Sequence, residues 1–132
     1  MGEPLTTLSP FVPFDAGVPL RATADYIERA HARLKAAFPS ASHLFSGHPG
    51  DGNLHFASGP HACEADQLKV DEIVYGLVAE IGGSISAEHG IGRIWKPFLP
   101  LSRGELELQL MARQKATLDP TQRLNTGRML SS

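Results

Sequence analysis

The chain has a single cysteine, no excess of charge and no long apolar run, and each shortage excludes a class of protein. Because Cys63 has no partner within the 132 residues, no internal disulfide can form, and a reducing, cytoplasmic setting is expected. Twelve basic and fourteen acidic side chains give a formal charge of −2, which provides no electrostatic basis for binding nucleic acid or an anionic membrane. The longest apolar stretch, residues 73–85, is interrupted by Glu80 and is too short to span a bilayer.

The remaining composition is that of an ordinary globular domain, with 42% hydrophobic and 20% charged residues. Residues 1–4 have neither the basic nor the apolar part of a signal peptide. We therefore expect one soluble domain over residues 1–132, with residues 1–10 forming an irregular lead-in.

Apolar periodicity predicts the element order β-α-β-β-α-β followed by one more helix. Strands are expected at residues 11–18, 42–47, 54–58 and 84–87, and helices at residues 21–38, 66–81 and 102–118. The first six elements match the split βαβ, ferredoxin-like arrangement, so the predicted class is α+β with an additional C-terminal helix and tail. One sheet face would carry two helices and leave the other face to a partner domain.

Local signals set the expected element ends. Gly82 and Gly83 are a natural stop for the helix before them. Ser102 and Glu105 have the spacing of a capping box, which predicts that the last helix opens at Ser102. Asp119 followed by a proline should end that helix.

Two short motifs hold most of the chemistry: residues 48–55, which read His-Pro-Gly-Asp-Gly-Asn-Leu-His, and residues 88–92, which read Glu-His-Gly-Ile-Gly. Asp51-Gly52 is typical of a hairpin turn, and a hairpin centred there would place His48 opposite His55 on one face of two strands. Two imidazoles and the carboxylate of Glu88 are ordinary ligands of a divalent metal such as zinc, manganese or iron.

Plainer interpretations of the same residues stay open. His48 and His55 could be hydrogen-bonded turn histidines, and Glu88 could form a salt bridge with Arg93 or Lys96. Those two cations could also meet a substrate carboxylate or line a solvated rim. If the strand continued through Glu88, His89 would point away from it, which would separate a ligand from an acid/base. Three other histidines are expected to be surface or structural residues: His31, His43 and His61.

Five segments together resemble the C-terminal domain of FAD-linked oxidases in the vanillyl-alcohol oxidase superfamily. They are the Asp-Ala-Gly-Val-Pro of residues 15–19, residues 47–55, residues 84–92 with Lys96, Lys115, and residues 118–128 with their Leu-Asn-Thr-Gly-Arg ending. Within that superfamily, the chain resembles the branch that contains glycolate oxidase, D-lactate dehydrogenase and D-2-hydroxyglutarate dehydrogenase. Pro49 and Thr126 depart from the family pattern, and Ala57 replaces an asparagine that holds the substrate carboxylate in some members, which leaves the exact substrate open.

The resemblance implies specific roles. His48, His55 and Glu88 would be ligands of a divalent metal, His89 would be the acid/base beside a small 2-hydroxy acid, and Asn125 would contact the cofactor. FAD itself would be held mainly by an N-terminal FAD-binding domain that is absent here, so the chain alone is expected to be inactive. We also expect an exposed interdomain surface to make the isolated chain a homo-oligomer, through the sheet face opposite the helices.

Two other functions are consistent with the residues. One is a free-standing metal-binding or regulatory module without redox chemistry, since the ferredoxin-like scaffold commonly serves this purpose. The other is metal-dependent hydrolysis, in which a site with two histidines and one carboxylate activates water. The leading hypothesis remains the substrate and metal half of an FAD-dependent D-2-hydroxy-acid dehydrogenase.

Overall fold

The computed structural model describes residues 9–61 and 63–130, so most of the predicted lead-in lies outside the described residues. Three strands form one antiparallel sheet in the order β1-β3-β2. They are β1 (Val12–Gly17), β2 (Ser42–His48) and β3 (Asn53–Gly59). The central strand β3 therefore follows β2 through a hairpin and pairs on its other side with the first strand of the chain.

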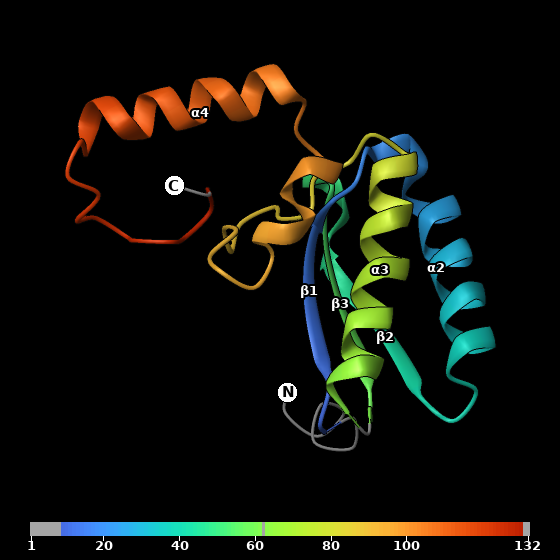
Figure 1. The fold of residues 1–132 in the computed structure, drawn as a ribbon. Helices are drawn as coiled ribbons and strands as arrows, with labels where there is room; N and C mark the ends of the chain where they lie inside the picture. Colours follow the sequence, from blue (N-terminus) through green and yellow to red (C-terminus); the bar gives the residue numbers. More distant parts are fainter. Residues whose placement is uncertain (1–8, 62, 131–132) are drawn as a thin grey trace.

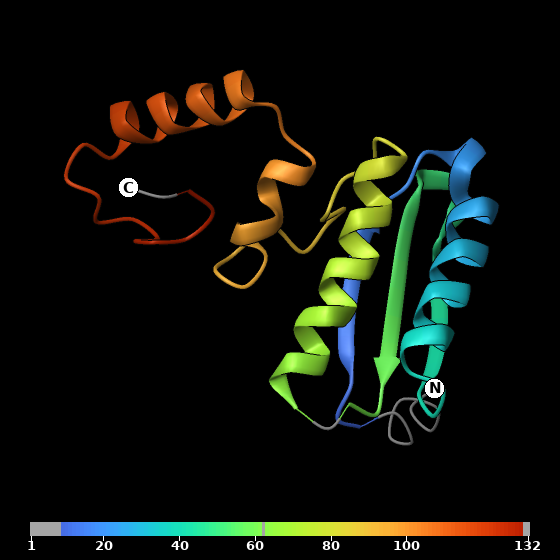
Figure 2. The same cartoon turned by 45° about the vertical axis from the view of Figure 1, so that its right-hand side comes forward.

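Two helices, α2 (Thr23–Ala37) and α3 (Glu64–Glu80), lie side by side on one face of this sheet (Figures 1 and 2). Helix α2 buries Tyr26, Ala30 and Leu34, which recur every four residues and so form one stripe. The core also includes side chains of α3 and two sheet phenylalanines, Phe14 and Phe56. Because strand side chains alternate, the residues next to these phenylalanines lie on the opposite sheet face.

This arrangement confirms the predicted α+β class, but the predicted fourth strand is reduced to a single bridge. The backbones of Gly17 and Ser84 exchange two hydrogen bonds of 2.8 Å, and the pairing stops there. The predicted strand at residues 84–87 was too long because the N–H of Ala87 donates to the side chain of Asp15 instead of to a neighbouring strand.

Gly82 ends α3 as predicted. Its φ of 66° is accessible to glycine without the steric cost that other residues meet, and its N–H donates to the carbonyl of Ala79 at 3.1 Å. The next N–H, from Gly83, donates to the carbonyl of Val78 at 2.9 Å. The chain is thereby returned towards β1, where the Ser84 bridge forms.

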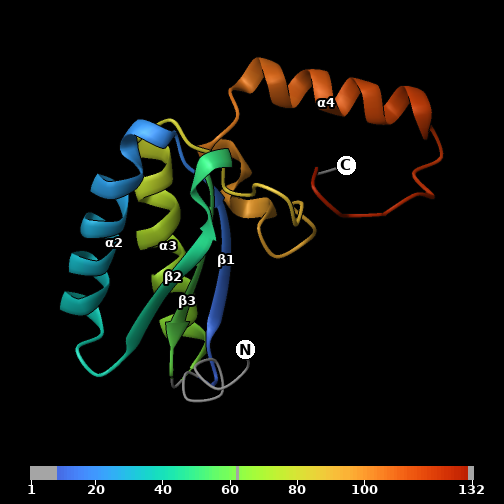
Figure 3. The same cartoon turned by 180° about the vertical axis from the view of Figure 1, so that it is seen from behind.

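The last helix, α4 (Glu105–Leu118), begins three residues later than predicted. Ser102 directly follows a 3₁₀ helix, η3 (Lys96–Leu101), and donates its N–H to the carbonyl of Leu99. The carboxylate that supports the start of α4 is that of Glu107, which accepts a 2.7 Å hydrogen bond from the N–H of Gly104. Helix α4 buries none of its residues and stands apart from the sheet and its two helices (Figures 1 and 3).

The hairpin between β2 and β3 is centred one residue earlier than predicted. His48 pairs with Asn53, and His55 pairs with Ser46, so the predicted direct pairing of His48 with His55 is wrong. A short 3₁₀ turn, η2 (Pro49–Asp51), occupies the connection. The carbonyl of Gly52, which has a φ of 70°, accepts a 2.7 Å hydrogen bond from the N–H of Val18, the residue after β1, and no local turn rule includes this contact.

Candidate functional site

The sheet register brings the candidate histidines to the face opposite the helices. Asp15 on β1 lies directly across from His55 on β3. Because the hairpin centre moves by one residue, the strand partner of His48 moves by two, from His55 to Asn53. A shift by an even number keeps side chains on the same face, so His48 still shares a face with His55 and lies diagonally from it. The imidazole centroids of His48 and His55 are 5.9 Å apart. The expected convergence of these two rings is therefore reached by a different register.

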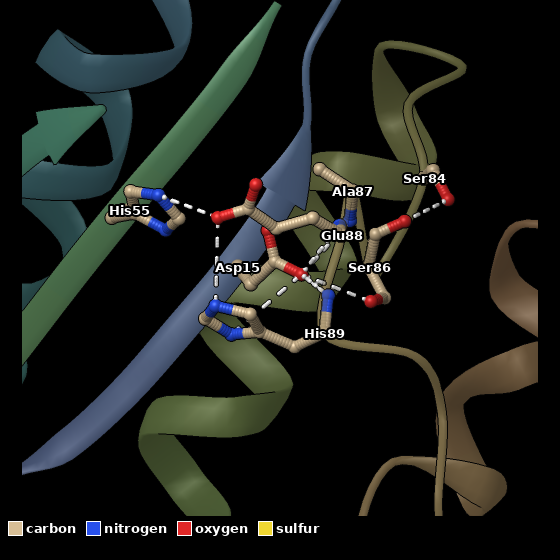
Figure 4. Close-up of polar contacts among 7 residues, drawn as sticks. All are labelled: Asp15, His55, Ser84, Ser86, Ala87, Glu88 and His89. Carbon is tan, nitrogen blue, oxygen red and sulfur yellow. Dashed lines mark hydrogen bonds and ion pairs between the residues drawn. The ribbon is translucent and has the colours of Figure 1, made fainter. Parts of the chain in front are cut away.

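Asp15 is a fully buried carboxylate that holds the chain segment after the Ser84 bridge (Figure 4). Its Oδ2 accepts a 3.0 Å hydrogen bond from the hydroxyl of Ser86. The same oxygen accepts backbone N–H bonds from Ala87 at 3.1 Å, Glu88 at 2.9 Å and His89 at 2.7 Å. Four donors on one oxygen fix the backbone from which the side chains of Glu88 and His89 emerge.

These donors also keep the Asp15 carboxylate ionised. Burial by itself raises its pKa, because a charge is costly away from water. The hydrogen bonds from the backbone of His89 and Glu88 and from the Ser86 hydroxyl, with the nearby His89 ring, outweigh this effect. The net result is a pKa of Asp15 below the ordinary value.

His55, Glu88 and His89 form a compact cluster. Glu88 Oε1 lies 3.1 Å from His55 Nε2 and 3.6 Å from His89 Nε2 (Figure 4). The two imidazoles are nearly parallel, with centroids 5.4 Å apart. One potential ligand atom from each of the three residues lies within 4.8 Å of the other two. Two ring nitrogens and a carboxylate oxygen at this spacing fit the donor set of a borderline divalent cation.

The cluster departs from the expected division of roles in two respects. His89 does not point away from Glu88, because the strand does not continue through these residues and both side chains turn towards His55. His48 stands beside His55, outside the group of three ligand atoms. About half of the Glu88 and His89 side chains is exposed, and about a quarter of His55, so a small molecule can reach them.

The cations that sequence reasoning paired with Glu88 contact the tail instead. Arg93 donates to the carbonyl of Thr126 at 3.1 Å, and Lys96 donates to that of Gly127 at 3.4 Å. The carbonyl of Asn125, an exposed residue with a φ of 48°, accepts the N–H of Arg128 at 3.1 Å. Asn125 thus lies in a turn that is tied to the segment following His89, and is not part of the imidazole–carboxylate cluster.

The functional residue that sequence reasoning left without a role is Asp15. A carboxylate between Phe14 and Ala16, inside a strand of buried residues, requires hydrogen-bond donors, and this was the available signal. Its donors could not be identified in advance, because they lie 71 to 74 residues further along the chain.

The fold and the site define an α+β domain that presents histidine and glutamate side chains on the open face of its sheet. Residues 9–129 match the family model of FAD linked oxidases, C-terminal domain. The chain belongs to this family. The description of this family refers to FAD-linked oxidases, and the matched region is their C-terminal domain.

Curated relatives agree with this assignment. A D-2-hydroxyglutarate dehydrogenase of Stutzerimonas stutzeri is 31% identical over 96% of this chain and 29% of its own length. The mitochondrial D-2-hydroxyglutarate dehydrogenase of Bos taurus is 40% identical over 89% of this chain and 21% of its own length. A D-lactate dehydrogenase of Anaerostipes hadrus is 36% identical over 63% of this chain and 18% of its own length. The chain therefore spans less than a third of each of these relatives.

Among the described residues, 9–61 and 63–130, no helix is long and apolar enough to cross a membrane.

Proposed function

We propose that this chain is the substrate- and metal-binding part of an FAD-dependent D-2-hydroxy-acid dehydrogenase. The observation that carries the proposal is the meeting of His55, Glu88 and His89, from two distant segments, on an accessible sheet face. The family match and the three dehydrogenase relatives supply the reaction class. Since the chain spans less than a third of those relatives, the complete activity needs an FAD-binding domain, and the chain alone is not expected to oxidise substrate.

His48, His55 and Glu88 are proposed to hold a divalent metal, with His89 as the acid/base. When bound, the metal supplies Lewis-acid stabilisation of a substrate alkoxide, and the flavin supplies the acceptor for the hydride from the substrate Cα. The half-exposed imidazole of His89 accepts the proton of the substrate hydroxyl, so its ring must be neutral before the reaction. The Asp15 contacts hold the backbone of His89 and so limit where its ring can lie.

The metal half of this proposal can be tested on the 132-residue chain itself. Titration of metal-free protein with Zn²⁺ or Mn²⁺ in a calorimeter should show micromolar binding. His55→Ala should weaken that binding at least about tenfold, the usual effect of losing an imidazole that orients or ligates a metal. His31→Ala is the matched control, because His31 is exposed on α2 and has its ring contact with His43 instead.

A second pair of variants separates the two possible ligand sets. Loss of affinity in His48→Ala with binding retained in His89→Ala supports the proposed ligands. The reverse pattern assigns the metal to His55, Glu88 and His89, and moves the acid/base role elsewhere. No micromolar binding by the unmodified chain, or equal affinity in the His55→Ala and His31→Ala variants, would overturn the metal site.

A further inference from the structure

The proposed chemistry of His89 depends on which of its two ring nitrogens carries the proton. A neutral imidazole has one N–H and one lone pair, and only the lone pair can accept a proton from a substrate hydroxyl. Which nitrogen is protonated is set by the partner of the other nitrogen. The Glu-His-Gly-Ile-Gly motif does not specify this partner.

The structure places a different carboxylate next to each nitrogen of this ring (Figure 4). His89 Nδ1 lies 3.8 Å from Asp15 Oδ2, and His89 Nε2 lies 3.6 Å from Glu88 Oε1. The distances are similar, but the surroundings differ. Asp15 is fully buried, whereas half of Glu88 is exposed to water.

Burial makes Asp15 the stronger of the two influences. The field of a charge is weakened much less inside a protein than at a wetted surface, so Asp15 acts on Nδ1 more strongly than Glu88 acts on Nε2. Glu88 Oε1 also lies closer to His55 Nε2, at 3.1 Å, than to the ring of His89. A proton on Nδ1 is attracted by Asp15, while a lone pair on Nδ1 would be repelled.

Asp15 also controls where the ring can go. The His89 N–H donates to Asp15 Oδ2 at 2.7 Å, and the neighbouring Glu88 N–H donates to the same oxygen at 2.9 Å. The backbone that carries the ring is therefore tied to the same oxygen that faces Nδ1. Rotation of the ring about its Cβ–Cγ bond would turn Nδ1 away from this fixed carboxylate.

We propose that Asp15 is a positioning residue that holds His89 in the Nδ1–H tautomer, so that the unprotonated Nε2 faces the His55–Glu88 cluster. The inference deepens the proposed function, and rests on it for its meaning in catalysis. Asp15 does not touch substrate in this arrangement. It acts through His89, by selecting the nitrogen that is free to accept a proton.

The tautomer can be observed directly in the chain as it exists. Long-range ¹H–¹⁵N correlation spectra of the ¹⁵N-labelled, chelator-treated protein distinguish Nδ1–H from Nε2–H, at a pH well above the ordinary imidazole range. His89→Gln identifies the His89 signals by their loss. We expect the unmodified protein to show mainly the Nδ1–H form at His89.

Asp15→Asn removes the charge but keeps an oxygen that can accept the backbone N–H groups. In this variant the tautomer ratio at His89 should move by about tenfold or more towards Nε2–H, the form that free histidine prefers in water. Asp119→Asn is the matched control. Asp119 is also a buried carboxylate that accepts two backbone N–H groups, from Arg123 and Leu124, but it supports the tail.

The outcomes separate this inference from the proposed function. A dominant Nε2–H form in the unmodified protein overturns it, even if Asp15→Asn fails to fold. So does an unchanged tautomer ratio in a folded Asp15→Asn protein, as judged by circular dichroism. Neither result depends on metal, so the metal titration can fail while the tautomer assignment stands, and the reverse also holds.

Discussion

A second group of histidines shows how burial changes the chemistry of a single residue. His43 and His61 lie at the end of the sheet away from His48, and both hydrogen-bond the fully buried hydroxyl of Ser58. His43 Nδ1 is 3.0 Å from Ser58 Oγ, and His61 Nε2 is 2.8 Å from it. The hydroxyl has one proton, so it donates to one neutral ring and accepts from the other.

Several groups oppose a positive charge on His43. Burial lowers its pKa to about 4, and the nearby His31 and Lys35 of α2, together with His61, act in the same direction. Ser58 and the ring of Phe56 on β3 also face it, and neither carries a charge. Three histidines were expected to be surface or structural residues. Two of them, His43 and His61, have a structural role, because their neutral rings hydrogen-bond the buried hydroxyl of Ser58.

This environment predicts that stability falls in mild acid. The unfolded chain binds a proton on His43 near the ordinary pKa of 6.5, whereas the folded protein does so only near pH 4. In that window the unfolded state binds more protons, so the free energy of unfolding should rise with pH, by at most about 1.4 kcal/mol per pH unit from this one group. Urea unfolding at a series of pH values measures the slope.

The variant His43→Gln isolates this contribution, because an amide can still bond Ser58 but does not titrate. Its pH profile should be flatter than that of the unmodified protein between those pH values, while His31→Gln, which removes only one of the causes of the lowered pKa, should change the slope less. Parallel profiles for the unmodified and His43→Gln proteins would show that folding does not lower the pKa of His43.

At this scale, the sequence indicated which residues of the two motifs lie close together, while their roles stay a proposal. The motifs identified His48, His55, Glu88 and His89 as a group, and the structure brings them to one region. Asp15 received no role because its partners are contributed by a segment that reaches it only after the sheet has formed.

Secondary-structure elements were predictable where the pattern is long and repetitive. Helices α2 and α3 and all three strands were anticipated to within two residues at each end. The errors occur where tertiary contacts compete with local signals. Gly52 is engaged by Val18 and so the hairpin centre moves, and Asp15 takes the N–H groups of the predicted fourth strand. The start of α4 was misplaced because η3 continues up to Leu101.

The segment that follows α3 and carries Glu88 and His89 requires two backbone stretches to lie very close together. A Cβ built on Gly83 would lie 2.5 Å from the carbonyl oxygen of Gly17 and 3.0 Å from Val78 Cγ1. Backbone cannot move aside as a flexible side chain can. The bridge between Gly17 and Ser84, which starts the segment carrying Glu88, therefore needs a glycine at position 83.

Two alanine substitutions at glycines should have opposite effects. Gly83→Ala should destabilise the protein by about 1–3 kcal/mol, the usual cost of forcing an extra methyl group into a packed site. Gly76→Ala, in the middle of α3 with nothing within 4 Å of the new Cβ, should stabilise it by about 0.5–1 kcal/mol. Urea midpoints of the two variants provide the comparison. Unchanged or increased stability of Gly83→Ala would contradict the predicted clash.

The whole molecule has two parts that are built differently. The sheet with α2 and α3 encloses a core of buried side chains, whereas α4 lies to one side and has no fully buried residue, with the partly buried Leu108 and Met111 packed against the core. On α4, Leu106 is 81% exposed and Leu110 is 58% exposed, one helical turn apart on the same side. Apolar residues grouped in this way are a common sign of a surface that another protein part covers.

This distribution bears on the predicted self-association. The sheet face opposite the helices was the expected contact, but it carries the polar site and is partly covered by the segment that binds Asp15. The apolar side chain exposed there is Leu44, at 39%. Helix α4 presents more apolar surface, so we expect it to provide the main contact between copies of the isolated chain.

We therefore predict that the chain forms dimers or larger species at high micromolar concentration, and that the double variant Leu106→Glu/Leu110→Glu is monomeric. Each leucine withdrawn from water contributes about 1.5–3 kcal/mol, so losing two per subunit should weaken association at least about a hundredfold. Leu44→Glu tests the sheet face in the same way. Sedimentation of the three proteins distinguishes the possibilities. A monomer without any substitution rejects self-association, and dissociation by Leu44→Glu but not by the α4 variant returns the contact to the sheet.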